Sequence, residues 1–208
     1  MAEWWSDKLK EHLDLPSAKQ RAIQTDALFR NRRTEDGWLA LEIRLYRVHL
    51  EFLVWIEDPS KETAAANDQY TVSILRLVKS LCERKTLSQV ILDHVEMILH
   101  ILGFSDYFAK LSSTVSISKD KTIDRKLSFK FVKLLKGKTD ALTYEYMRIR
   151  EAPILWQLRL FGEYMDRSMD SKPDKRVSFE PDGWQRTVLD CLDERKSVLV
   201  VGTYPIYS

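Results

Sequence analysis

The first hundred residues carry apolar side chains at three- and four-residue spacing, which predicts a series of helices. The longest run covers Trp38–Glu57, where this spacing lines one face and further apolar residues widen it. A helix that is apolar around so much of its circumference is expected at the centre of a bundle. The other predicted helices cover Glu3–Leu15, Ser17–Asn31, Lys61–Lys85 and Thr86–Leu102. Short connections favour antiparallel neighbours, so we predict a helical accessory bundle over residues 1–108.

Two local signals mark the ends of the last of these helices. Thr86 and Gln89 have the spacing of a capping box, in which two side chains satisfy free backbone N–H groups of the first turn. Gly103 follows the last apolar position and suits the C-terminal stop, because glycine adopts the left-handed conformation without strain.

Residues 109–176 have a different pattern, with short and mixed apolar runs. Ser112–Ser118 alternates polar and apolar residues but is weakly patterned. The predicted elements are a linker that leads into a basic helix or strand at 126–136, helices at Ala141–Glu151 and Pro153–Met165, and a polar loop at Ser168–Arg176. We interpret this region as a basic linker with docking helices.

The last thirty residues predict a helix followed by a strand. Asp182 suits the N-cap of a helix over Gly183–Glu194. Trp184, Val188 and Cys191 are expected on the buried side of that helix. Ser197–Val201 is a short, continuous apolar run rich in β-branched residues, typical of a strand buried on both faces of a parallel sheet. The partner strands of such a sheet are not found in the rest of these 208 residues.

Composition places the chain among globular proteins of one domain, or of one domain and part of a second. Its 208 residues are 44% hydrophobic and 31% charged, with a net charge of +2. The charge is uneven, because nine basic and two acidic residues lie between Lys110 and Lys138. Cys82 and Cys191 are far apart, which argues against a disulfide framework and a structural zinc site. A reducing compartment is therefore the expected setting.

The sequence shows no constellation for metal-dependent or nucleophilic catalysis. His94 and His100 lie six residues apart, so they face different sides of a helix and do not share one ion. No serine elbow and no cysteine beside a base is present. Charged residues interrupt the most apolar stretch, and no secretory signal is readable. We expect a soluble, cytoplasmic protein without a metal site or a membrane span.

Two C-terminal segments together resemble a known family. Phe179-Glu180-Pro181-Asp182-Gly183-Trp184-Gln185, a helix and then Ser197–Val201 resemble the approach to the first motif of superfamily 2 ATPases. Upstream, Trp156–Arg167 followed by Asp170-Ser171 and Arg176-Val177 resembles the Ski2-like DExD/H-box RNA helicases of the large antiviral type. The resemblance covers about residues 120–201. Together with the bundle predicted from apolar spacing, it implies a mainly α fold, in which the bundle is followed by the first helix and strand of an incomplete P-loop α/β ATPase lobe.

The resemblance implies a site for adenine at the start of that lobe, over residues 177–201. Gln185 would read the polar edge of the base through its planar amide, and Phe179 or Trp184 would cover the face of the base, with Phe179 preferred. The alternative is purely structural. Asp182 and Gln185 also have capping-box spacing, and Trp184 has the spacing of an ordinary core residue.

The sequence departs from the family directly after this segment. The family continues into a glycine-rich loop that ends in Gly-Lys-Thr and binds the phosphates of ATP with Mg²⁺. Here residues 202–208 read Gly-Thr-Tyr-Pro-Ile-Tyr-Ser, which we interpret as an aberrant tail derived from translated intron. ATP and Mg²⁺ are therefore implied for a full-length parent, and no ATP hydrolysis is expected from these 208 residues alone.

The implied partners of the parent are RNA and the rest of the helicase core. Lys126, Lys130, Lys133 and Lys136 are the candidate contacts to the RNA backbone. The alternative, which we favour on sequence, is a helix with these lysines on its solvated face and apolar residues packed inward. A second function also stays open: a non-catalytic helical interaction or regulatory module that binds a protein partner through the bundle.

Overall fold

The computed structural model describes most of the chain, and the chain divides into two compact units. These units are Met1–Arg150 and Glu151–Ser208, and each is described by itself. The described residues are 2–29, 37–84, 86–118, 125–137, 139–162, 164 and 171–199. In this part of the chain the structure is mainly helical, which confirms the mainly α prediction.

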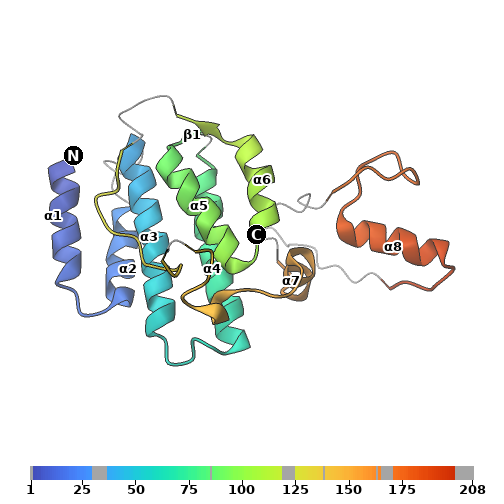
Figure 1. Cartoon of the computed structure of the whole chain (residues 1–208), viewed down its shortest axis with the longest axis horizontal. Coiled ribbons are helices and arrows are strands. Elements are labelled where there is room, and N and C mark those ends of the chain that lie inside the picture. Colours follow the sequence, from blue (N-terminus) through green and yellow to red (C-terminus); the bar gives the residue numbers. More distant parts are fainter. Residues whose placement is uncertain are drawn as a thin grey trace. The chain divides into compact units, whose positions relative to one another are not determined.

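The first unit holds six helices, a two-stranded sheet and a short 3-10 helix among its described residues (Figure 1). The elements are α1 (Ala2–Leu13), α2 (Ala18–Leu28), α3 (Gly37–Glu57), α4 (Ala64–Cys82), β1 (Thr86–Leu87), α5 (Gln89–Leu102), α6 (Ser105–Thr114), β2 (Ser116–Ile117) and η2 (Glu145–Met147). The helices α1 to α5 correspond to the five that the apolar spacing predicts, each within a few residues at its ends.

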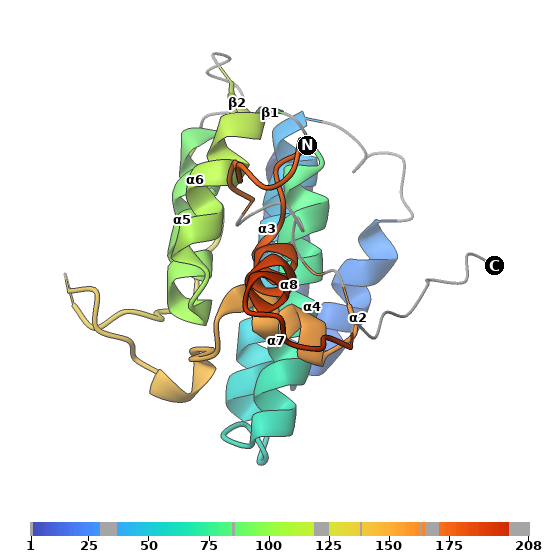
Figure 2. The same ribbon diagram turned by 90° about the vertical axis from the view of Figure 1, so that its right-hand side faces the viewer.

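The long helix α3 lies at the centre of the bundle, as its sequence predicts. It packs most extensively against α2 and α4. Figures 1 and 2 both show α3 between α2 on one side and α5 on the other. Twelve of its 21 residues are buried. The wide apolar stripe therefore has a simple explanation, because α3 has neighbours on several sides.

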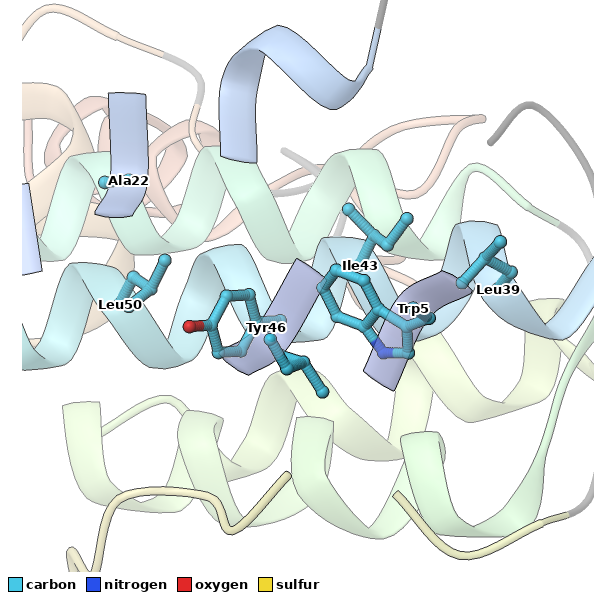
Figure 3. Close-up of a cluster of buried hydrophobic side chains, with 7 residues drawn as sticks. Trp5, Ala22, Leu39, Ile43, Tyr46 and Leu50 are labelled. Atoms are coloured by element: carbon cyan, nitrogen blue, oxygen red, sulfur yellow. The ribbon is translucent and has the colours of Figure 1, made fainter. Parts of the chain in front are cut away.

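One hydrophobic cluster joins the first three helices (Figure 3). Along α3 its residues follow the helical repeat in a single row, and the indole of Trp5 from α1 lies over this row. The cluster consists of Trp5 and Leu9 of α1, Ala22 of α2, and Leu39, Ile43, Tyr46 and Leu50 of α3. Trp5 and Tyr46 meet edge to face, with ring centroids 5.5 Å apart.

The start of α5 differs from the predicted capping box. Thr86 belongs to β1, and the N-cap of α5 is Ser88, whose hydroxyl accepts a hydrogen bond from the Ile91 N–H at 3.3 Å. Gly103 ends α5 as predicted, with a left-handed φ of 93°. An added Cβ at Gly103 would lie 2.5 Å from the carbonyl oxygen of Ile149, so close backbone approach also requires glycine there.

The weakly patterned stretch after α5 folds into a helix and a strand. Helix α6 continues through Thr114, and β2 then pairs in parallel with β1 in the register Thr86↔Ser116 and Leu87↔Ile117. Residue 108, where we expected the bundle to end, lies inside α6, and the compact first unit covers Met1–Arg150.

The helix predicted at Ala141–Glu151 is wrong. Within this range the structure contains only the short 3-10 helix η2. The Thr143 N–H donates to the Leu134 carbonyl at 2.7 Å, and the Lys136 N–H donates to the Ala141 carbonyl at 2.8 Å. These bonds form an antiparallel bridge, so the backbone groups that a helix would use are already paired across a turn.

The second unit contains α7 (Pro153–Arg159) and α8 (Gly183–Asp193). Pro153 begins α7 as predicted, but the helix ends before Leu160 and does not reach Met165, which lies outside the described residues. Phe161, two residues after the end of α7, has a left-handed φ of 51°. Asp182 is the N-cap of α8, as predicted.

Two expectations for the end of the chain are not met. None of the residues of α8 is buried, so Trp184, Val188 and Cys191 are only half-buried. Residues 197–199 are irregular rather than a strand, and the side chain of Leu199 is 88% exposed. An apolar strand needs neighbouring strands to pair its backbone and cover its faces. Val200, Val201 and the tail 202–208 lie outside the described residues.

Candidate functional site

Gln185 occupies the third position of α8 and forms a capping box with Asp182. Its Oε1 accepts a hydrogen bond from the Asp182 backbone N–H at 2.9 Å, and the Asp182 side chain accepts one from the Gln185 backbone N–H. The Ser171 hydroxyl donates to Asp182 Oδ1 at 2.6 Å. The structural role that the sequence offered for Gln185 is therefore real. The capping box uses the amide oxygen of Gln185, whereas recognition of adenine also needs its Nε2 group as a donor.

The two candidate stacking residues differ in position and exposure. Phe179 lies in the irregular segment before α8 and is 56% exposed, so one of its faces is accessible to a ligand. Trp184 lies in the first turn of α8 and is half-buried. Phe179, Trp184 and Gln185 lie within one short segment, and their contact with adenine stays a prediction.

Arg176, whose contacts the sequence did not predict, ties this segment to α8. Arg176 Nε and Nη2 donate to the two carboxylate oxygens of Asp174, at 2.9 and 2.6 Å. Its Nη1 donates to Asp190 and to Asp193, at 2.8 Å each. The guanidinium holds the pKa of Asp174 down at about 2. The only sequence signal for these bonds of Arg176 is the spacing of Asp190 and Asp193, which places two carboxylates on one face of a helix.

The basic segment at residues 125–135 is an extended strap rather than a helix, and we call it the basic strap. It runs beside α3 in the first unit (the yellow trace in Figure 1). The rings of Phe129 and Tyr46 are 4.9 Å apart, and the rings of Phe131 and His49 are 5.5 Å apart. Leu134 is buried. The helix that our preferred alternative assumed is therefore wrong, although apolar residues do pack inward as it required.

The four candidate lysines are exposed on the basic strap and just after it. They are Lys126, Lys130, Lys133 and Lys136. Neighbouring lysines of this set are three or four residues apart, which in an extended chain corresponds to about 10–14 Å. Separated in this way, the ammonium groups form a line of point charges rather than a single anion pocket.

Side chains of α3 bind the backbone of the basic strap. The Ser128 N–H donates to Glu42 Oε1 at 2.5 Å, and the Val132 N–H donates to His49 Nδ1 at 3.0 Å. Glu42 is 2% exposed and also accepts a bond from Trp5 Nε1 at 3.1 Å. Burial lowers the pKa of His49 to about 4, which keeps the ring neutral and Nδ1 available as an acceptor.

No group of three or more His, Cys, Asp or Glu side chains among the described residues is arranged to hold a metal ion. Burial raises the pKa of Cys82 to about 12, so its thiol stays protonated. None of the helices in the described ranges is long and apolar enough to cross a membrane.

Comparison with known proteins finds a short similarity to a helicase. No protein-family model matches the chain, and no solved structure matches it. A stretch of 49 residues is 47% identical to an uncharacterized helicase of Caenorhabditis elegans. This stretch is 23% of the present chain and 3% of that helicase, so the match spans a very small part of its relative. The similarity shows helicase-like sequence over part of the chain.

Proposed function

We propose that this chain is a helicase-related segment that joins a helical accessory bundle to the adenine-recognition segment of an ATP-dependent DExD/H-box RNA helicase. The observation that carries the proposal is the 47% identity over 49 residues to a helicase, together with the resemblance of residues 156–201 to the approach to the ATPase core. In the whole helicase, ATP hydrolysis would drive the remodelling of RNA.

The chemistry of residues 179–185 supports a contact with adenine. In the described chain, the Nε2 group of Gln185 makes no hydrogen bond, so it has two donors for the acceptor nitrogens of a purine. The ring of Phe179 is exposed enough to stack on the base. Arg176 and the capping box stiffen the segment before a ligand arrives, which lowers the entropic cost of binding.

ATP with Mg²⁺ is the cofactor that this proposal implies for the whole helicase. Residues 1–208 contain no Gly-x-x-x-x-Gly-Lys-Ser/Thr motif, so the part of the nucleotide that they would contact is the base. The contribution of this chain is to select and orient adenine, and hydrolysis is assigned to the remainder of the ATPase core.

The test replaces Gln185 by Glu and measures the binding of adenosine to the full chain. A glutamate at this position still accepts the Asp182 N–H bond of the capping box, but it cannot donate to adenine. We expect photolabelling by 8-azidoadenosine within the peptide that contains Phe179–Gln185, competed by adenosine but not by guanosine. In Gln185→Glu the labelling should fall about tenfold, the effect of losing a donor worth about 1.4 kcal/mol.

Two controls make this result specific. Adenosine is uncharged, so the new carboxylate does not repel it. Circular dichroism should show an unchanged helix content in Gln185→Glu. A Glu180→Gln variant changes a neighbouring side chain and should label as the unmodified chain does. Equal labelling of Gln185→Glu, or equal competition by guanosine, would show that Gln185 serves α8 alone and that the adenine proposal is wrong.

The second function, a protein-interaction module, rests on one separate observation. Leu155, Leu158 and Phe161 follow one another at three-residue spacing in and after α7, and they are 57, 49 and 70% exposed. Exposed apolar side chains in a row are typical of surfaces that bind another protein. If this function holds and the first does not, adenosine labelling should be absent altogether.

A further inference from the structure

Two stretches of the chain repeat the same pattern of two basic residues, an apolar residue, serine and phenylalanine. They are Arg125–Phe129 and Lys175–Phe179. Basic residues two and three positions before a serine form a charge pattern that kinases with acidic substrate clefts recognise. We propose that Ser128 is a phosphorylation site for such a basophilic kinase, and that its phosphate releases the basic strap from α3. This inference does not depend on the proposed nucleotide site.

The groups that a kinase would read on the strap are accessible. Arg125, Lys126 and Ser128 are all exposed. The Arg125 guanidinium lies over the ring of Trp38, 4.0 Å from its centroid, a contact that another partner can replace. Phe129 is half-buried against the bundle, so the kinase needs the strap to open locally in order to bind this residue.

Such an opening breaks few bonds. Residues 125–134 are irregular, and their backbone forms no strand pairing before the bridge at Leu135. Two backbone N–H groups hold the strap to α3, those of Ser128 and Val132. Segments with few backbone hydrogen bonds open at the low end of the stability range of a protein.

The phosphate acts on the bond between Ser128 and Glu42. The γ-phosphoryl group of ATP forms a bond to Ser128 Oγ as its bond to ADP breaks, and the hydroxyl proton passes to the base of the kinase. The product carries about −1.5 to −2 charges at pH 7. This charge is on the same residue whose N–H is 2.5 Å from the buried carboxylate of Glu42. The phosphate and the Glu42 carboxylate carry like charges and repel each other, so the Ser128 end of the strap is pushed away from α3.

The neighbouring cations do not cancel this effect. Arg125, Lys126 and Lys130 belong to the strap itself, so they can neutralise the phosphate whether the strap is bound or released. Glu42, in contrast, is fixed on α3. The negative charge therefore destabilises the bound state selectively. Release would uncover the rings that now contact Phe129 and Phe131, which are those of Tyr46, His49, Phe52 and His94.

Ser178 provides a matched comparison within the same chain. It has the same sequence pattern and is exposed, but it belongs to the second unit and not to the strap. A phosphate on Ser178 should therefore leave the strap in place. Ser128→Ala and Ser178→Ala then separate the two sites in otherwise identical proteins.

The experiment treats the full chain with ATP and the catalytic subunit of the cyclic-AMP-dependent protein kinase, and maps the phosphate by mass spectrometry. We expect modification of Ser128 in the Ser178→Ala variant, and a marked loss of it when Arg125 is also replaced by Ala. Hydrogen exchange of the strap amides should then rise by about tenfold, since the opening becomes more favourable. Glu42→Gln keeps the acceptor oxygen without its charge and should reduce this rise.

Each contrary result overturns a defined part of the proposal. If a peptide of residues 125–135 is phosphorylated and Ser128 in the folded chain is not, the strap stays closed and the site does not exist. If neither is modified, the sequence pattern is not a substrate. If Ser128 is modified and strap exchange is unchanged, or changes equally on modification of Ser178 alone, phosphate does not release the strap.

Discussion

His49 shows how one side chain couples the protonation state to the packing of a segment that is distant in sequence. Its Nδ1 accepts the Val132 N–H, and its ring packs against Phe129 and Phe131. Burial is the main cause of its lowered pKa, and the charge of Arg21 acts in the same direction. A protonated ring would have to donate from Nδ1, so this bond to the strap would be lost.

This environment predicts a loss of stability in mild acid. The pKa of His49 is about 4 in the folded chain and about 6.5 when the chain is unfolded. Its contribution is complete above pH 6.5 and is lost as the pH falls toward 4, because the unfolded state binds the proton first. We expect the free energy of unfolding in urea to fall by about 2 kcal/mol between pH 7 and pH 4.5.

The control for this prediction is His49→Gln, which keeps an uncharged acceptor near Val132. Its stability should be lower at pH 7, owing to poorer packing, but should change less between the two values of pH. The pKa of His12 is also lowered by burial, so a smaller slope should remain in this variant. An unchanged slope would assign the acid sensitivity to other groups.

At the scale of the element, the basic strap turns one side inward and the other outward. Phe129 and Phe131 contact aromatic side chains of α3 and α5, whereas the candidate lysines are exposed. An extended chain alternates its side chains between two faces, which allows Phe129 and Phe131 to pack inward while Lys126 and Lys130 face solvent. The strap therefore presents cations to solvent while its backbone is held by Glu42 and His49.

The exposed lysines predict a salt-dependent affinity for single-stranded RNA. Replacing Lys126, Lys130, Lys133 and Lys136 together by Gln should weaken binding and lower the slope of log K against log salt by about 0.7 for each lost phosphate contact. Fluorescence anisotropy with a uniform-sequence RNA at ~50 to ~200 mM salt measures both quantities.

A matched variant distinguishes a specific strap effect from a change in net charge. It replaces four lysines that lie in helices of the bundle by Gln, namely Lys8, Lys10, Lys19 and Lys79. We expect this variant to keep most of the affinity and of the salt slope. If the two variants behave alike, the strap has no special part in binding RNA.

The helices also differ in how far local sequence could predict them. Helix α3 is evident because its apolar repeat continues over five turns. The segment Ala141–Glu151 was predicted to be helical, but the Thr143 N–H donates to the Leu134 carbonyl and the Ala141 carbonyl accepts from the Lys136 N–H, across a turn. Such pairing depends on residues that the bundle brings together, and the local pattern of apolar residues does not predict it. The strap was undecided between helix and strand for the same reason.

The candidate site was predictable in its parts but not in its internal bonds. The Asp182–Gln185 spacing indicated the capping box that the structure contains. The links from Arg176 to Asp174, Asp190 and Asp193 were not foreseen, because they join residues up to 17 positions apart. Whether adenine binds there stays a prediction, since capping and recognition use different atoms of Gln185.

At the scale of the whole molecule, nearly all of the buried core belongs to the first unit. Among the buried hydrophobic residues of the described chain, Trp156 is the only one that belongs to the second unit. In that unit, large apolar side chains such as Phe179, Leu192 and Leu199 are more than half exposed. The second unit is also short, and a unit of about 60 residues buries a smaller share of its surface and is only marginally stable alone.

This distribution predicts different behaviour for the two units when they are separated. Residues 1–150 should unfold cooperatively in urea with a midpoint close to that of the full chain, and residues 151–208 should show no cooperative transition. Far-UV circular dichroism measures both. A much lower urea midpoint for residues 1–150 than for the full chain would show that the second unit stabilises the first.

The sequence by itself determined the mainly helical fold, the central place of α3, the stop at Gly103 and the cap of α8. Each of these depends on side chains within a few residues of one another, whose spacing the sequence records directly. Tertiary structure alone decided that residues 125–135 form an extended strap, that Glu42 and His49 hold it, and that residues 197–199 are not a strand. These outcomes depend on which distant groups supply or withhold hydrogen-bond partners, and a backbone adopts the conformation in which its buried polar groups are paired.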